Sequence, residues 1–459
     1  MAIEIDKNKK NYQIKNGYVI SLTIGDYEYE SDITAIRIVN SLSSSYPIYI
    51  IKLNLRPAEI IKNKVFGQDI IKLSIKHIDF DNKEKDNPYN VLLLFLSGDF
   101  DIPQSNKLLT NSNSLQDLAP YTMHCVPYIA FQFMTYTCNF IFRDSTIPDI
   151  FSYIYNKSAN YIENDLLNIL YDYNSPYINT KRIEQLILPP TILKNHFDYL
   201  LEEFGLFSNW GCIFASVAED KPNKININAM DIGYQYESGE NIFNLKQIAI
   251  DTEDSDVDSY GYDNFYITNP IHTKYVANTT IGNIGNNIRM IHKPIDKFIR
   301  IGNSELNSVY TSNDEILMNE LNVLYGLPNF CSFDLSKKNE IFISETLSDR
   351  VKYNIDHICH YRDEKNEDTP QDLPWLQSGI SKQIMNFSQL SCKLEKHIPI
   401  FKFTNIGKMV TFSSETAEYL PYNGKYILYS SDMLFKRSKV WEMTVDLKII
   451  RPKWSMVNA

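Results

Sequence analysis

The stretch that most constrains the fold is Trp441–Ile449, close to the end of the chain. Its odd positions are all apolar and its even positions are all polar. This alternation predicts an antiparallel strand with one buried and one exposed face. Shorter runs at Met409–Phe412 and Lys425–Tyr429 precede it, and Asn423-Gly424 is a pair suited to a tight hairpin turn. The chain is therefore expected to close with an antiparallel meander.

Residues 16–100 carry the same kind of pattern in five or six short runs, which favours a small antiparallel barrel or sandwich. Gly25-Asp26 is expected to form a turn between the first two runs. A change of phase at Ile78 and Phe80 predicts a β-bulge. Val91–Leu96 is expected to be a short strand that is apolar on both faces.

Helical signals appear in the middle of the chain. Thr146 with Pro148 predicts the start of one helix, since Pro is favoured in a first turn. Thr191–Phe204 has one apolar stripe and is followed by Gly205, which predicts a second helix and its end. The remaining predicted elements are strand material at Tyr128–Phe142, a strand at Trp210–Val217 and a helix at Asp314–Tyr325.

Bulk properties exclude several classes of protein. The 459 residues predict about three domains. A net charge of −11 disfavours binding to nucleic-acid phosphates or to an anionic membrane surface. The six Cys lack framework spacing, so they are expected to be reduced thiols made in a cytoplasm. No signal peptide and no membrane span are expected.

The strongest candidate for a metal site is His357, Cys359 and His360, because imidazoles and thiolates bind zinc. Cys392 and His397 lie further along the chain. The first group is tightly spaced and has no second pair of ligands at zinc-finger spacing, so ordinary core or interface residues are expected. No metal and no cofactor are therefore predicted.

Three acids at Asp254, Asp256 and Asp258 resemble the start of a calcium loop. Ser259 and Phe265 stand where such a loop requires Gly and Glu, so a solvated acidic loop is expected. Phosphate-binding glycine loops, nucleophile elbows and the His-Glu-x-x-His motif are absent from the sequence. Glu202 and Glu203 lie on the polar edge of a predicted helix, and no catalytic residue is predicted.

The order of these segments resembles the baseplate hub family of contractile-tailed phages, whose relatives include the N-terminal half of type VI secretion spike proteins. Three stretches carry the resemblance: Phe66–Ile75, with an acidic residue before an alternating strand; Pro189-Pro190 followed by His196–Phe207; and Ile406–Val410 with Tyr422–Tyr429 before the last strand. They lie within about half of the chain, at 16–100, 145–235 and 395–455.

The resemblance implies a β-rich α+β fold with two antiparallel tube-type β-barrel domains and an inserted or flanking helical α+β region. The expected parts are a first barrel at 1–100, a connection with strands at 101–147, an α+β domain at 148–235, a mixed region at 236–390 with a possible insertion and the start of the second barrel, and the rest of that barrel at 391–459.

The resemblance also implies a structural virion protein and not an enzyme. Such a hub is a homotrimer in the tail baseplate, assembled in the host cytoplasm, that adapts the sixfold tail tube to the threefold spike. Its partners are the tail tube protein or a tube-initiator ring, the central spike protein and baseplate wedge proteins, while DNA passes through its channel without specific binding. Two alternatives stay open: a host-binding or fibre-attachment component of the tail, and a cell-wall polysaccharide hydrolase that uses a carboxylate pair.

Overall fold

The computed structural model describes residues 17–56, 70–78, 87–100, 118–162, 164–180, 182–207, 210–247, 264–267, 271–275, 298–301, 341–344, 358–361, 388–395, 400–438 and 441–451. Most of these residues belong to strands, and the helices are few and short. The predicted β-rich character is confirmed. None of the helices in these ranges has the length and apolar character needed to cross a membrane.

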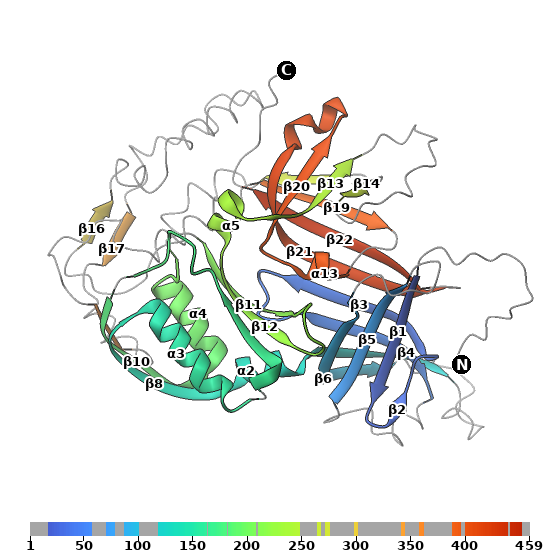
Figure 1. The fold of residues 1–459 in the computed structure, drawn as a ribbon, viewed down its shortest axis with the longest axis horizontal. Helices are drawn as coiled ribbons and strands as arrows, with labels where there is room; N and C mark the ends of the chain where they lie inside the picture. The colour runs from blue at the N-terminus through green and yellow to red at the C-terminus, as the bar shows by residue number, and fades with distance from the viewer. Residues whose placement is uncertain are drawn as a thin grey trace, which may run out of the picture.

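The largest sheet contains strands from both ends of the chain (Figure 1). Its hydrogen-bonded order is β14-β13-β20-β21-β3-β4-β7-β6-β5-β1-β2, and β22 and β19 extend it beside β21, with β15 next to β19. The strands of the N-terminal part are β1 (Gly17–Ile24), β2 (Tyr27–Glu28), β3 (Ile33–Ser41), β4 (Ile48–Leu55), β5 (Ile70–Ile78), β6 (Tyr89–Phe100) and β7 (Ala119–Pro127). The others are β13 (Asn241–Gln247), β14 (Asn264–Ile267), β15 (His272–Tyr275), β19 (Ser388–Glu395), β20 (Met409–Ser414), β21 (Gly424–Arg437) and β22 (Trp441–Arg451).

Strands β1 to β7, called here the N-terminal strands, curl around an apolar interior. Their inward side chains alternate along each strand, as with Tyr49, Ile51 and Leu53 on β4, none of which is measurably exposed. The ring of Tyr18 on β1 meets the ring of Phe435 on β21 edge-on, at 5.2 Å between centroids. The curled sheet thus brings β1 back toward β21, but the described ladder does not close into a barrel.

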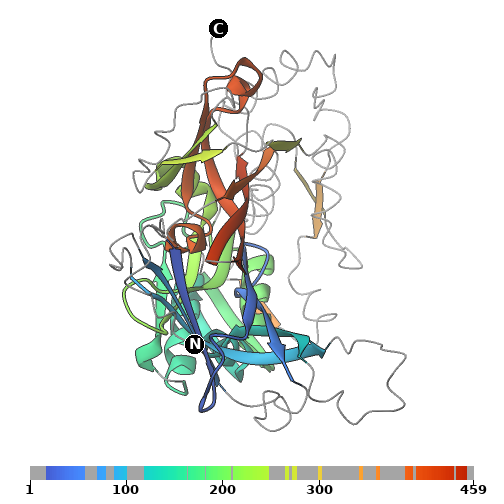
Figure 2. The same ribbon diagram turned by 90° about the vertical axis from the view of Figure 1, so that its right-hand side faces the viewer.

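Strand β21 joins the two ends of the chain. It pairs with β3 from Ser430↔Ser41 to Lys436↔Ala35 and with β22 along most of its length. Turned by 90°, strands β19 to β22, called here the C-terminal strands (red), continue upward from the N-terminal strands (blue) (Figure 2). One continuous sheet therefore connects segments about 390 residues apart in the sequence.

Residues 128–238, called here the layered region, place helices between two small sheets (Figure 1). The helices between the sheets are α2 (Tyr128–Thr135), α3 (Ile147–Ala159) and α4 (Leu193–Glu203), and α5 (Ile232–Ser238) follows β12 at the end of the region. One sheet has the order β18-β10-β8, with β8 (Thr137–Thr146), β10 (Arg182–Ile192) and β18 (Ile358–Tyr361). The other has the order β11-β12-β9, with β9 (Leu167–Tyr171), β11 (Gly211–Val217) and β12 (Ile225–Asp231). A two-stranded sheet of β16 (Phe298–Ile301) and β17 (Ile341–Ser344), the helix α13 (Ile400–Thr404) and the 3-10 helices η1 (Asn164–Leu166) and η4 (Ala417–Tyr422) complete the described elements.

Several sequence predictions are confirmed. Trp441, Met443, Val445, Leu447 and Ile449 on β22 are all buried. Gly25 has a positive φ of 56° in the turn between β1 and β2. The first predicted helix, α3, begins at Ile147 and is capped by Thr146. The second predicted helix, α4, is followed by Gly205 at a φ of 69°.

Four predictions about local structure are wrong. Tyr128–Thr135 is a helix and not strand material, because Ile129, Ala130, Phe133 and Met134 are the buried positions and have helical spacing. The β1–β5 ladder is regular up to Gly17↔Ile78, and His77 is buried as the alternation continues, so the described ladder contains no bulge. Strand β6 extends to Phe100 instead of ending at Leu96, whose side chain is 48% exposed.

The fourth wrong prediction is the hairpin turn at Asn423-Gly424. The connection between β20 and β21 contains the 3-10 helix η4, and Asn423 follows that helix. The Asn423 side chain accepts a hydrogen bond from Ser414 N at 2.7 Å and donates one to Ser414 O at 2.9 Å. The side-chain amide of Asn423 thus pairs with the end of β20 as a backbone peptide would. This pairing holds the ends of β20 and β21 together although their connection is longer than a tight turn.

Other predictions lie outside the described residues. These are the helix at Asp314–Tyr325 and the acidic loop that contains Asp254, Asp256 and Asp258. The first stretch of the resemblance, Phe66–Ile75, is described only from Ile70 onward. The division into two barrel domains stays a prediction.

Candidate functional site

A row of charged side chains lies on the neighbouring strands β3, β21, β22 and β19, where the two ends of the chain pair in the large sheet. Arg37 on β3 donates from Nε to both carboxylate oxygens of Asp432 on β21, at 2.8 and 3.0 Å. Asp446 on β22 lies opposite Asp432, and Lys393 on β19 lies opposite Asp446. The hydrogen bond to Asp432 raises the pKa of Arg37 above its usual value. The bidentate geometry fixes the register of β3 against β21 more than it adds stability, because the pair is partly exposed.

The layered region contains a buried carboxylate, Asp231, at the start of α5. Its Oδ1 accepts from Tyr234 N at 2.9 Å, and its Oδ2 accepts from Ser175 Oγ at 2.6 Å. Asp172 accepts from Asp231 N at 2.8 Å and from Gln235 Nε2 at 3.1 Å. Both carboxylates are thus engaged in capping and bracing α5, which is a structural role.

A cavity of about 250 Å³ lies between the sheet β9-β12-β11 and residues 401–408. Leu170, Phe214 and Met230 come from the sheet, and Phe401 and Ile406 come from the opposite side. Gly407 closes this junction with a φ of 83°, and a Cβ atom built on it would lie 2.6 Å from Met230 Sδ. Only glycine allows the two parts to approach this closely.

Three exposed tyrosines and one half-buried tyrosine surround α3 and are called here the α3 surface: the exposed Tyr153, Tyr161 and Tyr173, and the half-buried Tyr136. Tyr161 is 72% exposed and stacks on Tyr136, with 5.3 Å between ring centroids. Tyr173 is 60% exposed, and its hydroxyl lies 3.1 Å from Ser152 Oγ of α3. Exposed aromatic rings with fixed orientations are enriched in protein interfaces. The α3 surface is therefore the best candidate for an assembly contact among the described residues.

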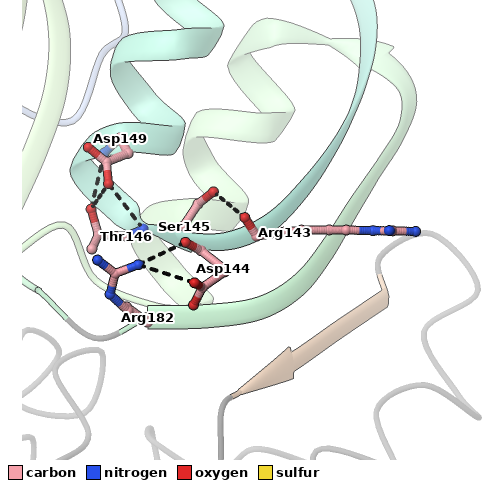
Figure 3. Close-up of polar contacts among 6 residues, drawn as sticks. All are labelled: Arg143, Asp144, Ser145, Thr146, Asp149 and Arg182. Atoms are coloured by element: carbon pink, nitrogen blue, oxygen red, sulfur yellow. Dashed lines mark hydrogen bonds and ion pairs between the residues drawn. The ribbon is translucent and has the colours of Figure 1, made fainter.

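The corner between β8 and α3 fixes the position of this surface (Figure 3). Thr146 and Asp149 form a capping box, in which Thr146 Oγ1 accepts from Asp149 N and Asp149 Oδ2 accepts from Thr146 N, each at 3.4 Å. Asp144 adopts a φ of 47°, and Arg182 Nη1 donates to its carbonyl oxygen at 3.1 Å. The Arg143 side chain points away from these contacts.

The candidate metal residues lie in parts of the chain for which the structure describes little. The backbone of β18 places Cys359 opposite Leu186 and His360 opposite Gln185 on β10, while His357 and His397 lie outside the described residues. Cys392 is on β19 of the large sheet, and burial raises the pKa of its thiol to about 12. In the described ranges no three His, Cys, Asp or Glu side chains form a group suited to a metal ion.

The residues that shape these surfaces were not singled out by the sequence. Asp172 and Arg37 look like ordinary polar positions, since their partners are 59 and 395 residues away, and the second partner of Asp231, Ser175, is 56 residues away. Thr146 is the exception, because the cap signal is local. The α3 surface could have been suspected only from the high Tyr content, 31 residues in the whole chain.

Comparison with known proteins gives similarity in structure only. No protein-family model and no curated protein matches the sequence. A tail protein from Neisseria meningitidis MC58 has a TM-score of 0.47 at 8% identity, with 95% of this chain and 96% of that chain covered. The 43 kDa tail protein of prophage MuSo2 from Shewanella oneidensis gives 0.46 at 9% identity, covering 95% and 98%.

The E. coli c3393 protein, a component of the type VI secretion system, has a TM-score of 0.44 at 10% identity, with 95% of this chain and 79% of that chain covered. The chain is thus similar over nearly its whole length to phage tail proteins and a type VI secretion component.

Proposed function

We propose that this protein is the central hub of a phage tail baseplate, a structural protein of the virion tail. The observation that carries the proposal is the pairing of β21 with β3, which joins the N-terminal strands and the C-terminal strands in one sheet. Two β modules per chain are what a trimer needs in order to present six similar modules to a sixfold tube. In this proposal the modules are the tube-type barrels expected at 1–100 and within 236–459, with the layered region between them.

The expected surroundings follow from this arrangement. The homotrimer meets the tail tube protein or a tube-initiator ring on one side, the central spike protein on the other, and wedge proteins at its periphery. Among the described strands, β2 and β14 end the hydrogen-bonded order of the large sheet, and in this proposal their edges pair with neighbouring chains, which would protect them from non-specific association. The exposed rings of the α3 surface suit a contact with a neighbouring protein.

The decisive experiment is the mass of the purified protein in solution, measured by light scattering with and without candidate tail proteins. A trimer, or a monomer that becomes a trimer when the spike protein is added, is the expected result. A chain that stays monomeric with every tail partner contradicts the hub role and favours the host-binding or hydrolase alternatives.

A channel for DNA is the second part of the proposal. A net charge of −11 suits a channel through which DNA passes without adhering, since basic side chains would bind phosphates. Lysine substitution of exposed acids on the sheet, beginning with Glu442 and Asp446 on β22, tests it. Slower DNA ejection from particles that carry these substitutions is the expected result for acids that line the channel, and unchanged ejection across all exposed acids contradicts it.

A further inference from the structure

The cavity between the sheet β9-β12-β11 and residues 401–408 is lined on the β12 side by a polar side chain with an unused hydrogen-bond acceptor. Asn228 lines this cavity and is only 5% exposed. Its Nδ2 donates to Phe214 O at 3.2 Å and to Ser216 Oγ at 2.9 Å. Its Oδ1 receives no hydrogen bond from the residues that the structure describes, so a donor that enters the cavity would satisfy it.

The same side of the cavity has a carboxylate that is not paired. Glu219 and Asp220 line it from the turn between β11 and β12. Asp220 lies 3.5 Å from Lys224 Nζ, whereas Glu219 forms no ion pair within the described part of the chain. Lys408, the cation on the opposite side, donates to Gln235 Oε1 at 3.3 Å. Lys408 keeps further donors, but the Asn228 Oδ1 and the Glu219 carboxylate are acceptors that a ligand could engage, and one of them is negative.

An extended polypeptide can reach this cavity from the side of β9. Strand β9 pairs only with β12 among the described strands, which leaves its other edge open. Leu170 on β9 lines the cavity and is 46% exposed. An open strand edge next to a pocket is the arrangement by which proteins bind an extended segment and select one of its side chains.

We propose that this cavity receives an arginine side chain from an extended segment of a partner polypeptide. The aliphatic stem would lie against Leu170, Phe214 and Met230, and the guanidinium would donate to Asn228 Oδ1 and to the Glu219 carboxylate. Arginine fits because it offers five donors and no acceptor, and a carboxylate acceptor strengthens its hydrogen bonds. Such binding needs the cavity alone and is independent of any trimer or DNA channel.

The test uses the full chain with 13C-labelled methionine methyl groups and the probe Nα-acetyl-arginine amide. Met230 lines the cavity, and Met123, buried among the N-terminal strands, serves as an internal control. The expected result is a saturable shift of the Met230 methyl signal that leaves Met123 unchanged. Nα-acetyl-leucine amide, which has the same blocked backbone, is expected to produce no such shift.

Two substitutions separate recognition from folding. Glu219→Gln removes an exposed charge, and binding of the arginine probe is expected to weaken roughly 3- to 10-fold. Glu418→Gln on η4 makes the same charge change away from the cavity and is expected to have no effect. An unmoved Met230 signal, an equal response to the leucine probe, or equal affinities in the two variants would each overturn the proposal.

Discussion

The N-terminal strands and the layered region bury their interiors with different chemistry. Inside the N-terminal strands the alternating side chains are almost all apolar, and the hydroxyls of Tyr49 and Tyr89 hydrogen-bond each other at 2.5 Å. The layered region instead contains many buried polar groups: Ser158, Ser175, Asn179, His196, Asn228, Asp231 and Gln235. Apolar burial is non-directional, whereas a buried polar group is tolerated only with its partners in place. Replacing a single buried polar residue should therefore lower the free energy of unfolding more in the layered region than among the N-terminal strands.

The largest effect is expected for Asp231→Ala. The substitution removes the cap of α5 and leaves Tyr234 N–H and Ser175 Oγ without an acceptor, at a cost of roughly 3 kcal/mol. Hydrogen exchange of the Tyr234 amide should become at least about 100-fold faster. Asp231→Asn keeps one carbonyl acceptor, so its cost in free energy should be less than half that of Asp231→Ala. Equal exchange rates of the Tyr234 amide in the two variants would contradict the capping role of the Asp231 carboxylate.

A double-mutant cycle on Tyr49 and Tyr89 examines the polar pair among the N-terminal strands. Tyr49→Phe leaves the buried Tyr89 hydroxyl without its partner and should lower the free energy of unfolding by about 1–2 kcal/mol, as should Tyr89→Phe. The double variant removes both polar groups and should cost less than the sum of the two. Chemical denaturation measures all four proteins, and additive costs would show that the hydroxyls do not interact.

The same pair predicts a loss of stability at alkaline pH. Burial raises the pKa of Tyr49, and also that of Tyr89, well above the ordinary value of 10.0. The unfolded chain therefore releases these protons near pH 10 while the native chain retains them, so stability is full below that pH and falls above it. At pH 11 each tyrosine should cost about 1.4 kcal/mol, and Tyr49→Phe should lose correspondingly less on going from pH 8 to pH 11. Parallel pH curves for the two proteins would refute this origin.

The sequence predicts an element of the fold well when neighbouring residues determine it, and poorly when contacts between distant segments determine it. The strand at Trp441–Ile449 and the start of α3 at Thr146 are encoded by neighbouring residues, and both were predicted. Tyr128–Thr135 resembles a strand because it contains aromatic and β-branched residues, which favour strands, and its helical spacing emerges only from which residues are buried. The pairing of β21 with β3, the network at Asp231 and the cavity beside Asn228 all depend on contacts between distant segments, for which no local pattern exists.

The smallest changes in the free energy of unfolding are expected for two threonines, one from the layered region and one from the N-terminal strands. Thr146→Ala removes the cap of α3 and should lower the free energy of unfolding by about 1 kcal/mol, because the N–H of Asp149 loses its acceptor. Thr34 on β3 also uses its hydroxyl, donating to Lys52 O at 3.1 Å, but that bond is exposed and water can replace it. Thr34→Ala should therefore cost less than about 0.5 kcal/mol. Because α3 carries Tyr153 and Tyr161 follows its end, Thr146→Ala should also weaken any contact made through the α3 surface. Equal costs in the two variants would mean that the capping box does not hold the helix, and that the β8–α3 corner is fixed by Arg182 and Asp144 instead.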